Sequence, residues 1–265
     1  MIRNFVYVCI FALLLQTGNA IAGSGTSENL NKTESQDTAK ECFEGFSRAM
    51  FKFNHAMDKA LFEPVAKGYR ALPAPIRKGT GNVVDNLRSL LTLSNNVLQG
   101  DLRAAGNTAG RFAINTTVGI LGIFDPASRM GFDKKGKEDF GQTLGVWGAG
   151  SGCYFVLPVL GPTTARDTVG LVGNMFLDPV YQITHNNEVM DRSYSEHNYY
   201  YYKGTDAVDF RSKNIESIES LENNSIDFYA SVKSLYLQNR AQKIANSEGA
   251  AKSQDDSDWE EIDNQ

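Results

Sequence analysis

A stretch without a single charged side chain, the 26 residues 140–165, is the feature that most limits how this chain can fold. Its length would suit a membrane span, which needs about 20 apolar residues. Six glycines and two prolines interrupt the stretch, however, and they disfavour one regular helix. Irregular backbone survives at membrane depth only where protein or a wet cavity covers it. The stretch therefore fits two settings, an irregular element at membrane depth or a buried loop in a soluble core.

The N-terminus has the pattern of a secretory signal peptide. Arg3 precedes an apolar run of eleven residues, 5–15, and Ala20 and Ala22 supply the small residues that a signal peptidase reads. The run is too short for a spanning helix. We expect residues 1–22 to be the signal peptide, with cleavage before Gly23 and export of the remaining chain.

Two polar segments flank the central part of the chain. Residues 23–40 contain one large aliphatic side chain, Leu30, so they predict a flexible tether. Residues 246–265 carry seven acidic side chains and one lysine, which predicts an acidic disordered tail. Between them, residues 41–245 hold nearly equal numbers of acidic and basic side chains. Because this part has no basic field, we expect no nucleic-acid partner.

Helical spacing dominates residues 41–245, the expected folded domain. An apolar stripe at intervals of three or four residues predicts an amphipathic helix that Pro64 ends or kinks. The stripe consists of Phe43, Phe46, Met50, Phe53, Met57 and Leu61. It suits either a protein core or the interface of a membrane.

Further helices are predicted at residues 76–99, from Asp101 as N-cap through Phe112, and from a Thr163 or Thr164 cap to Leu177. Residues 178–205 look loop-like and tyrosine-rich, and helical spacing returns at 206–243. Few segments alternate with period two, so the predicted fold class is all-α, with one irregular glycine-rich segment and a C-terminal helical region.

No residue pattern suggests catalysis or a metal site. The chain lacks the GxSxG, HExxH and phosphate-loop motifs, and its cysteines and histidines do not cluster. The carboxylates Asp125, Asp133, Glu138 and Asp139 lie near three lysines and fit a solvated loop better than an acid–base pair. Cys42 and Cys153 are able to pair in an oxidising compartment, but nothing in the sequence fixes their proximity. We expect no catalytic residue, no metal and no cofactor.

Several blocks, in order, resemble the MlaA family, also called VacJ, of the outer-membrane phospholipid transport system. The blocks are SRAMFKFN at 47–54, Asn95 with Leu98, Gln99 and Gly100, RFAINTTVG at 111–119, EDFGQTLG at 138–145 with the glycines to Tyr154, and GPTTARD at 161–167. The likeness is strong from about Phe43 to Asp178. Neither Cys9 nor Cys42 has the small-residue leader that precedes the lipidated cysteine of the family's lipoproteins. We therefore expect a mature chain without an acyl anchor.

The resemblance implies a ring-like bundle of helices in the outer membrane, at its periplasmic face, with an amphipathic channel. It implies removal of misplaced phospholipid from the outer leaflet, which maintains lipid asymmetry, and partnership with a porin trimer and a periplasmic lipid carrier. A lipid-hydrolysing envelope enzyme and a structural surface protein are the alternatives.

Two sets of residues are the candidates for contact with lipid. The uncharged stretch supplies the predicted lipid path, because nothing else in the chain is both long and uncharged, and Tyr154 is expected at its polar edge. The path residues are Phe140, Gly141, Leu144, Gly148, Gly150, Gly152, Tyr154 and Leu157. The predicted membrane-facing helix contributes Phe43, Phe46, Met50 and Phe53.

Overall fold

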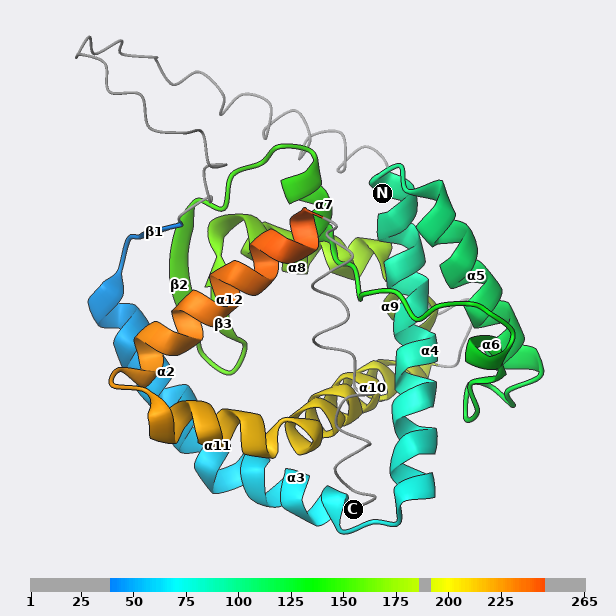
Figure 1. Ribbon diagram of the computed structural model, residues 1–265, viewed down its shortest axis with the longest axis horizontal. Helices are drawn as coiled ribbons and strands as arrows, with labels where there is room; N and C mark the ends of the chain where they lie inside the picture. Colours follow the sequence, from blue (N-terminus) through cyan, green and yellow to red (C-terminus); the bar gives the residue numbers. More distant parts are fainter. Residues whose placement is uncertain (1–38, 186–191, 246–265) are drawn as a thin grey trace, which may run out of the picture. The chain divides into compact units, whose positions relative to one another are not determined.

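The computed structural model describes residues 39–185 and 192–245, and these are mostly helical (Figure 1). The expected signal peptide, the acidic tail and most of the expected tether lie outside the described residues. The tether's last two residues do not, because Ala39 is buried and Lys40 opens the first strand. The helices and strands, in chain order, are β1 Lys40–Glu41, α2 Glu44–Met57, η2 Asp58–Phe62, α3 Glu63–Arg70, α4 Ala74–Leu98, α5 Leu102–Thr117, α6 Pro126–Arg129, α7 Phe140–Val146, β2 Cys153–Leu157, β3 Gly161–Thr164, α8 Ala165–Leu177, α9 Pro179–His185, α10 Arg192–Lys213, α11 Ile215–Asn224 and α12 Phe228–Ile244.

The sequence predicted that Pro64 ends or kinks the first helix, and α2 does not end there. It runs without a break through the π-helical turn η2 into α3, where Pro64 occupies the first turn. Pro64 has no N–H and cannot donate the backbone hydrogen bond that a continuous helix has at this position, and the π-helical turn η2 lies directly before α3. The predicted caps are confirmed, since the Asp101 side chain accepts a hydrogen bond from the amide of Ala104 and Thr164 accepts one from the amide of Asp167.

A three-stranded sheet is the part of the fold that an all-α prediction misses. Its order is β1-β2-β3, with β1 parallel to β2 and β2 antiparallel to β3. The hairpin turns at residues 158–160, where Val159 has a φ of +67° and Gly161 a φ of +82°. Strands β2 and β3 lie inside the uncharged stretch. Their sequences, CYFVL and GPTT, do not alternate between polar and apolar residues, so the sequence lacks the period-two pattern that predicts a strand. Residues 179–185 and 192–205 are likewise helical rather than loop-like.

The helices pack around this sheet and around the long helix α4. Helix α2 contacts β2 and β3, and α12 contacts β3 and α7 (Figure 1). Helix α4 contacts α5, α7, α8, α9 and α10, while α10 in turn contacts α3. A small apolar core of Ala39, Tyr154, Val156 and Tyr229 joins the sheet to α12, with Met50 and Phe51 of α2 packed against it. The ring-like arrangement stays a prediction.

The distribution of side chains is unusual for a protein surrounded by water. Many polar side chains are buried, among them Asn95, Gln142 and Asp167. Many large apolar side chains are exposed on the helices and on two turns. Contiguous exposed apolar surface marks a site that contacts a membrane or a partner. Among residues 39–185 and 192–245, no helix combines the length and the apolar character that crossing a bilayer requires.

Candidate functional site

The first half of the predicted lipid path is a packing surface between α7 and α8. A Cβ at Gly170 would lie 2.4 Å from the amide nitrogen of Gly141, so the two helix backbones almost touch. The ring of Phe140 covers Gly173 and meets the Trp147 ring edge-on at a centroid distance of 6.0 Å. Gly141 is buried and Leu144 is half-buried. Gly170 therefore permits the close packing of α7 and α8, while a Cβ at Gly141 would lie 2.7 Å from Asp167 and 2.8 Å from Arg240.

The next three glycines of the predicted path, Gly148, Gly150 and Gly152, differ in whether their backbone conformation requires glycine. Gly148 and Gly152 have φ angles of +89° and +67°, which L side chains rarely adopt. Gly150 has no such requirement, and a Cβ added there would meet open space. All three are exposed, together with the Trp147 side chain. This turn is the accessible part of the predicted path.

Tyr154 is not at an accessible edge, which corrects the prediction for this residue. Its side chain is 0% exposed and its hydroxyl has no hydrogen-bond partner within the described structure. The alternation of β2 explains the burial, since Tyr154 and Val156 point into the core while Phe155 and Leu157 are half-buried. Tyr154 packs against the rings of Tyr229 and Tyr236 of α12.

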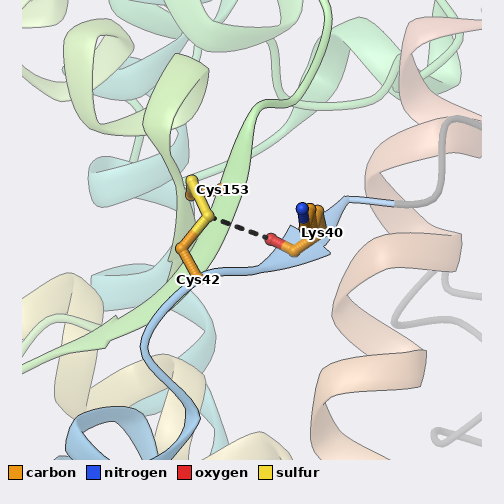
Figure 2. The surroundings of a disulfide bond; sticks show 3 residues. All are labelled: Lys40, Cys42 and Cys153. Carbon is orange, nitrogen blue, oxygen red and sulfur yellow. Dashed lines mark hydrogen bonds between the residues drawn. A yellow bond between two sulfur atoms is a disulfide. The ribbon is translucent and has the colours of Figure 1, made fainter.

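Two links fasten β2 to α2, so the two predicted lipid-contact sets are joined. Cys42 and Cys153 form a disulfide with Cα atoms 5.5 Å apart, and the Cys42 Sγ lies 3.8 Å from the carbonyl oxygen of Lys40 (Figure 2). Farther along, the Asn54 side chain donates to the carbonyl of Leu157 and accepts from the amide of Val159, both at 2.8 Å. Asn54 lies in one of the blocks that resemble the family, but only the structure reveals this role.

The predicted membrane-facing stripe of α2 divides into an exposed and a packed part. Phe43, Phe46 and Phe53 are 62%, 53% and 51% exposed. Met50 is half-buried and packs against the apolar core with Phe51. Three of the four residues thus present apolar surface outward, as an interfacial helix would.

Exposed apolar side chains also occur beyond α2. The hairpin turn held by Asn54 exposes Val159 and Leu160. Helix α8 exposes Val169, Val172 and Phe176, which share one helical face by their spacing. The segment after α5 exposes Val118, Ile120, Leu121, Ile123 and Phe124. None of these residues was predicted as a site. Those in the two turns carry no periodic signal, because they lie in irregular segments.

Arg240 of α12 holds the beginnings of α7 and α8 together. Its guanidinium donates to both carboxylate oxygens of Asp139, at 2.6 and 3.1 Å, and to both of Asp167, at 2.6 and 3.0 Å. The Tyr236 hydroxyl adds a 2.5 Å hydrogen bond to Asp167. Burial acts to raise the pKa of Asp139, but pairing with Arg240 outweighs it and lowers this pKa to about 2. Asp139 also caps α7, so it is structural and not part of a solvated loop.

Glu138 differs from its neighbour Asp139 because no cation in the described part of the chain forms an ion pair with it. Burial raises the pKa of Glu138 to about 7, although a hydrogen bond from the Gln99 side chain favours its ionised form. Gln99 also bonds Thr143, whose hydroxyl bonds Asn95. This polar chain connects the end of α4 to α7 through the interior.

These polar groups hold helices together, and nothing in their arrangement indicates catalysis. Among residues 39–185 and 192–245, no group of three metal-ligating side chains could hold an ion. His55 faces Glu222 at 3.1 Å. His185 stacks on Tyr181, and its Nδ1 lies 3.0 Å from the Tyr181 carbonyl oxygen and 3.2 Å from the Thr184 hydroxyl. The structure instead combines exposed apolar side chains on the outside with hydrogen-bonded polar groups in the interior.

Comparison with known proteins identifies the family. The family described as MlaA lipoprotein matches residues 39–243. The Intermembrane phospholipid transport system lipoprotein MlaA of Haemophilus influenzae is 32% identical over 232 residues, which cover 85% of this chain and 87% of that protein. The protein of that name from Escherichia coli is 34% identical over 145 residues, 53% of this chain and 58% of that one. A solved structure described as "Structural basis for maintenance of bacterial outer membrane lipid asymmetry" matches with a TM-score of 0.66 and 28% identity, over 77% of this chain and 99% of that chain. The chain belongs to the MlaA family.

Proposed function

We propose that this protein is an outer-membrane component of intermembrane phospholipid transport. It removes misplaced phospholipid from the outer leaflet through an amphipathic channel and so maintains lipid asymmetry. The observation that carries the proposal is the outward apolar surface of α2, α8 and the two turns around a polar interior. The relatives from Haemophilus influenzae and Escherichia coli are named for intermembrane phospholipid transport, which supports the proposal.

The physical demand of the task fits this arrangement. Two acyl chains contain roughly 30 methylenes, and exposing them to water would cost on the order of 24 kcal/mol at about 0.8 kcal/mol each. A transporter must therefore keep the chains in apolar contact while the headgroup stays hydrated. A protein immersed in one leaflet provides apolar contact outside and polar groups inside without consuming a nucleotide.

The disulfide supports the proposed location. Structural disulfides persist in oxidising compartments such as the bacterial periplasm. The Cys42–Cys153 bond is thus consistent with export by the expected signal peptide and with function at the periplasmic face of the outer membrane. A porin trimer and a periplasmic lipid carrier are the proposed partners, on the strength of family membership.

Two measurements test the proposal. Mass spectrometry of lipid that co-purifies with the full-length protein should find intact phospholipid; lysolipid would instead indicate hydrolysis, and no lipid a structural role. In cells that lack their own relative, a membrane-impermeant amine reagent should label excess surface phosphatidylethanolamine, and expression of this protein should lower the labelling. Unchanged labelling at normal protein level would contradict the proposal.

A further inference from the structure

A cavity lined mainly by residues with polar or charged side chains lies between α4, α5 and the segment at residues 134–137. Its volume is about 70 Å³, several times the ~10–15 Å³ that one water needs. Side chains from α4 form one wall, α5 contributes Thr108, Arg111 and Asn115, and the lysine-rich segment forms the third side. None of the predicted lipid-path residues lines the cavity, so it is distinct from that path.

Positive charge predominates around this cavity. Five cations line it, Arg88, Arg111, Lys134, Lys135 and Lys137, against two carboxylates, Asp85 and Asp125. The difference is 5 − 2 = +3, and it becomes +2 when Asp206, the partner of Arg88, is counted. Lys135 makes no ion pair with any residue in the described part of the chain. The surplus charge would be offset by a bound anion.

Four of the five cations are held in place by carboxylates before any ligand arrives. The Arg111 guanidinium is fixed by the Asp125 carboxylate at 2.7 Å and by the Phe132 carbonyl at 2.5 Å. Lys134 and Lys137 share one carboxylate, that of Asp85, at 3.2 and 2.9 Å. Burial acts to raise the pKa of Asp85, but these two ammonium groups outweigh it and keep this pKa below its usual value. The Lys137 ammonium has three N–H donors, so the shared Asp85 carboxylate leaves donors available for a ligand.

Two buried hydroxyl groups add neutral donors. Thr92 and Thr108 line the cavity, and each is 5% exposed. The Thr92 hydroxyl accepts from the amide of Glu138, and the Thr108 hydroxyl accepts from the Asn96 side chain. Neither hydroxyl donates a hydrogen bond to a described residue. A buried donor without an acceptor is costly, and an oxygen-rich anion at this position would satisfy both.

We propose that this cavity is a binding site for a phosphate group. A phosphate presents several acceptor oxygens to the two hydroxyls, and lysine and arginine side chains are suited to its charge. The same chemistry is offered by the phosphodiester of a lipid headgroup and by a small soluble phosphate. The site extends beyond the proposed transport function, because it would bind soluble phosphate whether or not lipid is moved.

Calorimetric titration of the full-length protein, in a detergent without phosphate, tests this site. Inorganic phosphate, glycerol 1-phosphate and glycerophosphoethanolamine are the three probes. At least one should bind saturably, with an affinity that falls as sodium chloride is raised. Tighter binding of glycerophosphoethanolamine would assign a lipid headgroup as the source, and tighter binding of either of the other two would assign a soluble phosphate. Either result supports the site.

Paired variants separate binding from folding. Lys135→Gln should weaken the affinity about fivefold, whereas Lys52→Gln on the exposed side of α2 should leave it unchanged. Thr108→Val should weaken it about tenfold, and Thr108→Ser, which keeps the hydroxyl, should retain it within about twofold. Circular dichroism confirms that each variant is folded. No saturable binding of any probe, or equal affinity in the wild type, Lys135→Gln and Thr108→Val, would overturn the proposal without deciding the question of lipid transport.

Discussion

Replacing both cysteines of the disulfide by serine should destabilise the protein strongly. The bond joins residues 111 positions apart, so it closes a long loop in the unfolded chain. In the chain-entropy account, a loop of this size corresponds to about 5 kcal/mol at 25 °C. A typical domain is stable by only about 5–15 kcal/mol, so the loss would take a large part of the total.

The destabilisation should begin at one end of the molecule. Strand β1 has only two residues, and its pairing with β2 involves Lys40 and Glu41 alone. Without the disulfide, that short pairing must hold the start of α2 against the sheet. The Glu41 carboxylate, which bonds Tyr229 and Lys233 of α12, should therefore be released as well.

Denaturant unfolding of the Cys42→Ser/Cys153→Ser protein, followed by circular dichroism, measures the loss. The free energy of unfolding in water, extrapolated linearly, should fall by several kcal/mol relative to the wild type. Reducing agent should lower the wild type to the level of the variant and leave the variant unchanged. Cys9→Ser is the matched control, since Cys9 lies in the expected signal peptide. Equal unfolding midpoints for the wild type and the double variant would refute the reasoning.

Three further outcomes follow from the site. Burial raises the pKa of Glu138 from 4.5 to about 7, so the stabilisation from its neutral form is present below pH 4.5 and is lost as pH rises through 7. Glu138→Gln should therefore raise the free energy of unfolding by about 2–3 kcal/mol at pH 8 and by little at pH 4. The double variant Phe46→Glu/Phe53→Glu should move folded protein from the membrane to the soluble fraction, because burying each phenylalanine contributes roughly 1.5–3 kcal/mol to membrane binding. The matched double variant with leucine at both positions should stay bound. Unfolding instead of release would contradict an interfacial α2. Gly150→Leu places its side chain in open space, so it should leave the protein level normal and let phospholipid accumulate in the outer leaflet. Gly141→Leu, whose Cβ would lie 2.7 Å from Asp167, should lower the protein level itself. Normal lipid asymmetry with Gly150→Leu would remove this turn from the mechanism.

Local signals in the sequence were sufficient for α4, α5 and α8 and for the caps of α5 and α8, but not for residues 179–185 and 192–205. Asp101 and Thr164 cap helices because their oxygens reach an amide three residues away, and that contact depends only on neighbouring residues. The stripe of α2 was visible for the same reason. The sequence did not show whether the stripe faces the core or lipid, because the spacing of apolar residues is the same in both cases.

Contacts between distant segments could not be predicted in this way. Arg240 is one of many charged residues in the C-terminal part, and nothing near it in sequence indicates Asp139 or Asp167 as its partners. The cysteines are separated by 111 residues, so spacing alone leaves their pairing open. Tyr154 was misplaced because its burial depends on a strand that an uncharged sequence conceals.

Under the proposed function the apolar face of helix α8 contacts lipid, and the packing of this helix shows what then holds the protein together. Val169, Val172 and Phe176 point outward, while Gly170 and Gly173 face α7. In lipid, burying apolar side chains gives no advantage over leaving them exposed, so packing must rely on close backbone approach and on polar bonds. The near-contact of Gly141 with Gly170 provides the first, and the four bonds from Arg240 to Asp139 and Asp167 provide the second. The glycines of the uncharged stretch and the buried charges beside it thus answer one requirement, a stable interior without a large apolar core.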